Sequence, residues 1–165
     1  MNSQNLKLFP TKSLNVELED LYSRSYEKLK GQTDLTDNLI STWTNKEFRG
    51  TVTEQGFKLI SSEIGRGAVC VYIGNFQNNS GTIQVRLNKA FQILFGILLS
   101  YPIIGFGLLL LTEGFNNALK FIPILLLLFL FIRYVFMGLS FWFISKTGLK
   151  KLARTLNIKS LNNKV

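Results

Sequence analysis

Two long apolar runs occupy the second half of the chain. The first, "FQILFGILLSYPIIGFGLLLL" (91–111), has 21 residues and no charge. At about 1.5 Å per residue, a helix of this length spans roughly 31 Å, the thickness of a bilayer core. The second run (121–144) contains 17 Leu, Ile, Phe or Val among its 24 residues, and Arg133 is its only charge. Both runs predict transmembrane helices, because a core helix of a soluble protein keeps a polar face and neither run has one.

The distribution of basic residues predicts the topology of these two spans. The loop between them, "TEGFNNALK" (112–120), has one acid and one base. The tail (145–165) has six Lys or Arg and no acid, and residues 1–89 have eleven Lys or Arg. Bases that flank a span stay on the cytoplasmic side. We therefore expect a two-helix hairpin in the cell inner (plasma) membrane, with the loop 112–120 outside and both termini in the cytoplasm.

A shorter pattern predicts a helix early in the first domain (1–90). The segment "VELEDLYSRSYEKLKG" places apolar residues and one serine on a single helical face, which predicts an amphipathic helix over 17–30. The residues before it, "KSLNVEL", are compatible with a brief strand. The members of the predicted helical face are Leu18, Leu21, Tyr22, Ser25, Tyr26 and Leu29.

Alternating apolar and polar residues then predict four strands, in "EFRGTVT", "GFKLISS", "AVCVYIG" and "TIQVRLN". Their connections are short and rich in Gly, Asn and Ser, as tight turns require. The predicted fold class is α+β: a short amphipathic helix plus a four-stranded antiparallel meander, then the transmembrane hairpin and a basic C-terminal helix. Because the last strand ends at Asn88, we expect the domain to lie close to the membrane.

The tail 145–165 predicts a basic amphipathic helix, because Leu149, Leu152 and Leu156 of "TGLKKLARTLNI" share one face. One interpretation places the leucines in the headgroup region and the flanking bases toward lipid phosphates. A plain topology anchor without lipid specificity is the preferred form of this interpretation, and packing of the same leucines on the meander is the alternative. The bases predicted to contact the membrane surface are Lys146, Lys150, Lys151 and Arg154.

The order of these segments resembles a group of small, uncharacterised bacterial two-helix membrane proteins with an N-terminal cytoplasmic α+β domain. The similarity is carried by "EFRGTV", "GFKLI" and "YIGNFQNNSGTIQVRLN", followed directly by a hairpin that contains "FIP". It extends from about Phe48 to Leu152. The chain departs from the group at residues 65–68, where the group has an Asn-Ser-Phe phrase and a proline. The resemblance implies the architecture and no activity.

Composition argues against several functional classes. The net charge is +9, but six bases lie in the tail beside a span, where an anionic leaflet accounts for them without nucleic acid. Because the chain has no histidine and Cys70 is its only cysteine, an intrachain disulfide and a Cys/His zinc site are excluded. The carboxylates have no spacing that specifies chemistry, and "GRG" (65–67) is better explained as a turn than as a phosphate loop. We expect no enzyme activity, cofactor or metal.

Arg133 is the one charged residue inside a predicted span. When the hairpin is folded about its loop, Arg133 comes level with about Leu99, beside Ser100 and Tyr101. Pro102 has no N–H, so the carbonyl of Leu98 loses its helical partner at the same depth. We therefore predict that the guanidinium donates to the Leu98 carbonyl or to the hydroxyls of Ser100 and Tyr101.

These observations favour a non-enzymatic inner-membrane protein whose membrane-apposed cytoplasmic domain binds a partner protein or lipid headgroups. Small residues on one side of the first span, Gly96, Ser100 and Gly107, allow close helix packing and a homo-oligomer. The alternatives are an oligomeric transport or permeation component, with Arg133 lining a path, and an accessory subunit of a larger membrane complex.

Overall fold

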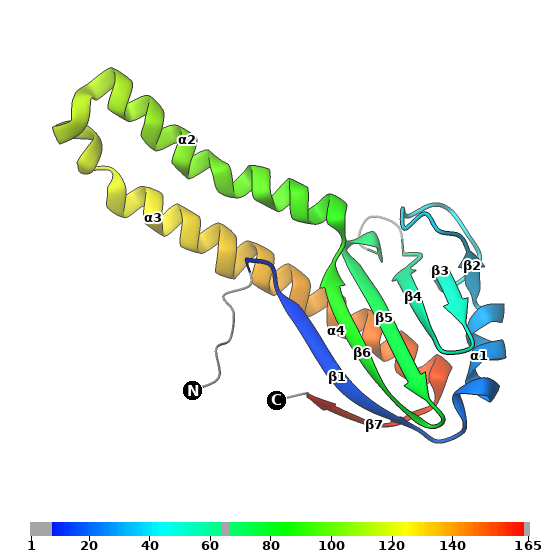
Figure 1. Ribbon diagram of the computed structural model, residues 1–165. Coiled ribbons are helices and arrows are strands. Elements are labelled where there is room, and N and C mark those ends of the chain that lie inside the picture. The colour runs from blue at the N-terminus through cyan, green and yellow to red at the C-terminus, as the bar shows by residue number, and fades with distance from the viewer. Residues whose placement is uncertain (1–7, 64–66, 164–165) are drawn as a thin grey trace. The chain divides into compact units, whose positions relative to one another are not determined.

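The computed structural model describes residues 8–63 and 67–163, the last without its side chain (Figure 1). The chain divides into two compact units. The sheet unit contains Met1–Asn88 and Phe143–Val165, and the helical unit contains Lys89–Trp142. The predicted tail therefore belongs to the same unit as the N-terminal domain.

The sheet unit is built on a seven-stranded sheet in the order β2-β3-β4-β5-β6-β1-β7. Neighbouring strands are antiparallel except β2 and β3, which are parallel, so the sheet is mixed. Helix α1 (Tyr22–Gly31), the single turn η1 (Gly67–Val69) and most of α4 (Met137–Leu156) belong to this unit. The predicted α+β class is confirmed. The strands are β1 (Thr11–Leu18), β2 (Thr33–Leu35), β3 (Phe48–Thr53), β4 (Gly56–Ser61), β5 (Cys70–Gln77), β6 (Ser80–Leu87) and β7 (Ile158–Asn163).

The sheet is three strands wider than predicted. The four predicted strands correspond to β3, β4, β5 and β6, which pair in sequence order, and β2, β1 and β7 extend the sheet on its two sides. The predicted helix 17–30 also began too early. Leu18 belongs to β1, and its N–H donates to the carbonyl of Asn79 at 2.7 Å. Glu17 pairs with Ser80 of β6 and Leu18 pairs with Ile158 of β7, so long-range contacts override the local helical pattern.

One face of the sheet carries the core of this unit. Tyr72, Leu59 and Val85 lie side by side on β5, β4 and β6, and all three are fully buried. Helix α1 contributes Leu29 to the core, and α4 (Met137–Leu156) contributes Leu152.

Residues 145–163 pack within the sheet unit. Leu149, Leu152 and Leu156 are buried within the sheet unit, and the Ser25 hydroxyl donates to the carbonyl of Leu156 at 3.2 Å. The chain then continues as β7, which pairs with β1. Of the two sequence-based alternatives, packing on the sheet is therefore the one observed, because the leucine face covers apolar surface of the sheet unit that would otherwise meet water.

The helical unit contains α2 (Lys89–Leu119), α3 (Ile122–Leu130), the π-helix η2 (Phe131–Phe136) and the first residues of α4. The predicted loop 112–120 is mostly helical. The Thr112 hydroxyl donates to the Leu108 carbonyl at 3.1 Å, and the helix is interrupted only at Gly114, where φ is 74°. The helix thus extends through polar residues, some of whose side chains bond back to its own backbone.

Two helices, Lys89–Leu119 and Ile122–Leu156, are long and apolar enough to cross a membrane. Only 17% and 11% of their most apolar 18-residue windows are buried. The second helix does not end at residue 144, as the hydrophobic run predicted, but continues to Leu156. The core helix of a soluble protein would be mostly buried, and these two are not.

Candidate functional site

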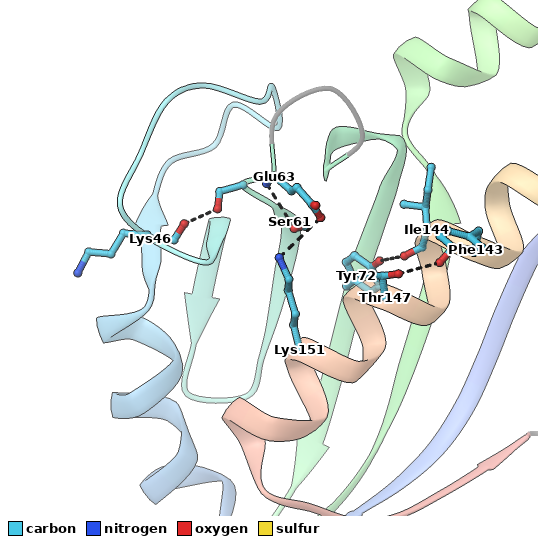
Figure 2. Close-up of polar contacts among 9 residues, drawn as sticks. Lys46, Ser61, Glu63, Tyr72, Phe143, Ile144, Thr147 and Lys151 are labelled. Carbon is cyan, nitrogen blue, oxygen red and sulfur yellow. Dashed lines mark hydrogen bonds and ion pairs between the residues drawn. The ribbon is translucent and has the colours of Figure 1, made fainter.

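Helix α4 contacts the sheet at Tyr72 of β5 (Figure 2). The Tyr72 hydroxyl donates to the carbonyl of Ile144 at 3.1 Å. One turn further along α4, Gly148 faces the same ring, and a Cβ added there would lie 1.9 Å from the Tyr72 hydroxyl oxygen. Only glycine allows this contact, which we call the Tyr72–Gly148 junction.

Polar side chains surround the junction. Lys151 pairs with Glu63 at 3.7 Å, and the backbone N–H of Glu63 donates to the Ser61 hydroxyl at 3.4 Å (Figure 2). The two charged side chains are about one-third exposed, so the ion pair contributes at most about 1 kcal/mol. The cavity beside them has a volume of about 10 Å³, enough for one water molecule. The junction is therefore a packing contact and not a ligand pocket.

The bases predicted to contact the membrane lie on the outer face of α4. Lys146, Lys150 and Arg154 are exposed, whereas Lys151 is half-buried and paired with Glu63. The same helix buries its leucines in the sheet unit, so they cannot enter the headgroup region. Contact of the bases with lipid phosphates stays a prediction.

An open hollow of about 720 Å³ is lined by residues of β1, β5 and β6 and by Gln55 between β3 and β4. Its lining contains amides and hydroxyls but no carboxylate and no basic side chain. Such a surface can exchange hydrogen bonds with a neutral polar ligand, but it has no group suited to general acid–base chemistry. The lining residues are Asn15, Val16, Gln55, Asn75, Phe76, Gln77, Ser80, Gly81 and Thr82.

Among residues 8–63 and 67–163, no group of three or more His, Cys, Asp or Glu side chains is placed to hold a metal ion. The "GRG" segment considered as a phosphate-binding turn lies mostly outside the described residues, since only Gly67 is described, as the first residue of η1.

Arg133 lies in the π-helix η2 of the helical unit. Its guanidinium is 3.8 Å from the sulfur of Met137 and 5.5 Å from the ring centre of Tyr134, both in the same continuous helix. On α2, the Ser100 hydroxyl donates to the Ile97 carbonyl at 2.6 Å, and Tyr101 is largely exposed. The predicted bonds from Arg133 to Leu98, Ser100 or Tyr101 stay a prediction. The local widening at η2 was not predicted, although such π-turns occur often at functional sites.

Cys70 provides a single internal probe of folding in the sheet unit. The thiol is fully buried, and burial raises its pKa from the ordinary 9.0 to about 12. We expect it to resist maleimide reagents in the native protein and to react after unfolding in urea, because the thiolate is the reactive form. Rapid labelling of native protein, at the rate of a free thiol, would contradict this burial.

The same shift predicts the effect of alkaline pH. Between pH 9 and about 12 the unfolded thiol loses its proton while the folded one keeps it, so the free energy of unfolding falls as pH rises through this range. Burial also raises the pKa of Tyr22 and Tyr72, which adds a loss of the same sign above about pH 10.

The Tyr72–Gly148 junction was not predicted, because the sequence contains no local signal that brings β5 and α4 together. Alternation placed Tyr72 in a strand but gave no partner for its hydroxyl. The chain matches no protein-family model, and no curated protein and no solved structure is detectably similar to it.

Proposed function

We propose that this chain is a non-enzymatic integral membrane protein whose sheet unit is held at the membrane surface, where it binds a partner protein or lipid headgroups. The observation that carries the proposal is the exposure of both long apolar helices, whose most apolar windows are 17% and 11% buried. In water such surfaces would aggregate, whereas lipid tails cover them without further cost.

The proposed topology is a hairpin in the cell inner membrane with both termini in the cytoplasm. One residue, Asn88, separates the end of β6 from Lys89 at the start of α2, and α4 continues from the helical unit into the sheet unit without a break. Exposed bases on the sheet-unit part of α4 fit the cytoplasmic side. The small residues of α2, Gly96, Ser100 and Gly107, further support a homo-oligomer, because they allow a second helix to approach closely.

Single-cysteine labelling in intact spheroplasts tests this topology. In a Cys70→Ala background, Asn116→Cys should react with a membrane-impermeant maleimide from outside, because the hairpin turn faces away from the cytoplasm. Lys150→Cys, an equally exposed position on α4, should react only after permeabilisation. Labelling of the position-150 thiol in sealed spheroplasts, with no labelling at position 116, would mean that the hairpin has the opposite topology.

The binding role is tested with the full-length chain in native membranes. Proximity labelling from a fusion to the sheet unit should enrich a defined set of proteins over a control in which the same label is carried by an unrelated two-span protein. Equal capture by both fusions would remove support for a protein partner.

A further inference from the structure

The loop between β2 and β3 exposes a tryptophan. Its tip, "ISTWTN" (40–45), contains no charged residue, and we call these six residues the loop tip. Trp43 is 90% exposed and Ile40 is 59% exposed. Tryptophan is highly buried on average in soluble proteins, so an almost completely exposed one at an uncharged tip requires an explanation.

Hydrogen bonds fix the residues that flank the loop tip on both sides. Before it, the Leu39 carbonyl accepts a hydrogen bond from the Asn88 side-chain amide at 3.0 Å. After it, the Lys46 carbonyl accepts a bond from the Ser62 hydroxyl, and the Lys46 ammonium donates to the Gly31 carbonyl at 2.6 Å. The exposure of Trp43 is therefore imposed by an anchored backbone.

The register of the sheet places this loop at one particular edge. Phe48 at the start of β3 pairs with Ser61 at the end of β4, and Cys70 at the start of β5 pairs with Leu87 at the end of β6. These four residues lie at one end of their strands, and we call this end of the sheet the proximal edge. The loop between β2 and β3 lies at the same end (Figure 1). The turns after β3 and β5, residues 54–55 and 78–79, lie at the opposite, distal edge.

The proximal edge is also where the chain leaves the sheet unit for the first apolar helix. Asn88, which bonds to the loop at Leu39, directly precedes Lys89, the first residue of α2. If α2 enters a bilayer, chain connectivity alone keeps Asn88 within a few residues of the membrane surface. The loop bonded to Asn88 is then held close to the headgroups.

We infer that the loop tip inserts Trp43 and Ile40 into the headgroup region of the cytoplasmic leaflet. Tryptophan is enriched at this depth because its ring is apolar and its indole N–H still finds a hydrogen-bond partner. The exposed Thr42 and Asn45 of the loop tip can bond to phosphates and glycerol esters, and the loop tip carries no charge that would have to be desolvated. The inference rests on the proposed function, since it requires the helices to span a membrane.

Tryptophan fluorescence tests the inference directly, because the chain has two tryptophans, Trp43 and Trp142. The full-length Trp142→Phe variant is reconstituted into vesicles of equal parts phosphatidylcholine and phosphatidylglycerol, with and without bromine near the top of the acyl chains. Trp43 emission should be blue-shifted relative to the urea-unfolded chain, and brominated lipid should quench most of it. The emission of Trp43 is also obtained without altering Trp142, by subtracting the emission of Trp43→Phe from that of the unsubstituted chain.

Two controls separate this inference from the proposed function. Trp43→Phe leaves Trp142, which lies in the helical unit and should be quenched if the helices are embedded. In a chain lacking both native tryptophans, Gln55→Trp places an exposed tryptophan at the distal edge, where quenching should be absent. Quenching of Trp142 without quenching of Trp43 overturns the loop insertion alone, and leaves a protein partner as the occupant of the loop tip. Absence of quenching at both positions overturns the membrane proposal as well.

Discussion

Replacing Gly148 with alanine should destabilise the sheet unit even though alanine is the better helix former. The added Cβ would lie 1.9 Å from the Tyr72 hydroxyl oxygen and 2.3 Å from the ring carbon that carries it. The Tyr72 ring cannot move aside freely, because its neighbours across the sheet, Leu59 and Val85, are also fully buried. Overpacking of this kind costs about 1–3 kcal/mol, and a clash this close belongs at the upper end. Helix propensity returns only about 1 kcal/mol, so the net effect is a loss.

Urea titration of the full-length chain in nanodiscs, followed by Cys70 labelling, measures this effect within the sheet unit. Gly148→Ala should lower the urea midpoint, and Gly148→Val should lower it further. Gly31→Ala is the matched control: it lies in α1 of the same unit, and a Cβ there meets nothing within 4 Å. An unchanged midpoint for Gly148→Ala would mean that α4 does not pack on Tyr72 as described.

A double substitution tests whether the clash acts through Tyr72. Tyr72→Leu alone should be destabilising, because it removes a buried ring and the hydrogen bond to Ile144. Combined with Gly148→Ala it should cost less than the sum of the two single changes, since the smaller side chain leaves room for the added methyl group. Additive costs would mean that the destabilisation by Gly148→Ala does not arise from a clash with Tyr72.

Patterns short enough to read locally predicted much of this fold. Apolar alternation located β3 to β6. It matches the buried face best in β6, where Ile83, Val85 and Leu87 are buried, whereas β4 and the first half of β5 are buried on both faces. The two hydrophobic runs located the long helices, because the length and apolar composition of a segment are enough to identify it, without knowledge of its contacts. Arg133 was also visible from composition alone, because it is the only charged residue in the second hydrophobic run.

What could not be predicted depends on contacts between residues distant in sequence. Leu18 fits a helical face as well as a strand, and only long-range pairing, with Ile158 of β7, decides between them. β2 has three residues, too few for any alternation to be visible. The leucines of α4 give the same period whether they face lipid or a sheet, so the sequence left both interpretations open. Trp43 was not singled out because a tryptophan in a loop gives no signal until its exposure is known.

The second large loss of stability is expected for Leu152→Ala, which truncates one of the leucines of α4. Leu152 is fully buried in the sheet unit, so truncating it leaves a cavity and should cost about 2–5 kcal/mol of unfolding free energy. Leu161→Ala on β7 is the control, because Leu161 is 41% exposed and a surface change is worth about 0.5 kcal/mol or less. If the segment were a membrane-surface helix, as its charge pattern also suggested, the two substitutions would leave the sheet unit equally stable. Equal urea midpoints by Cys70 labelling would therefore restore that interpretation, whereas a large drop for Leu152→Ala alone makes this part of α4 a core helix of the sheet unit.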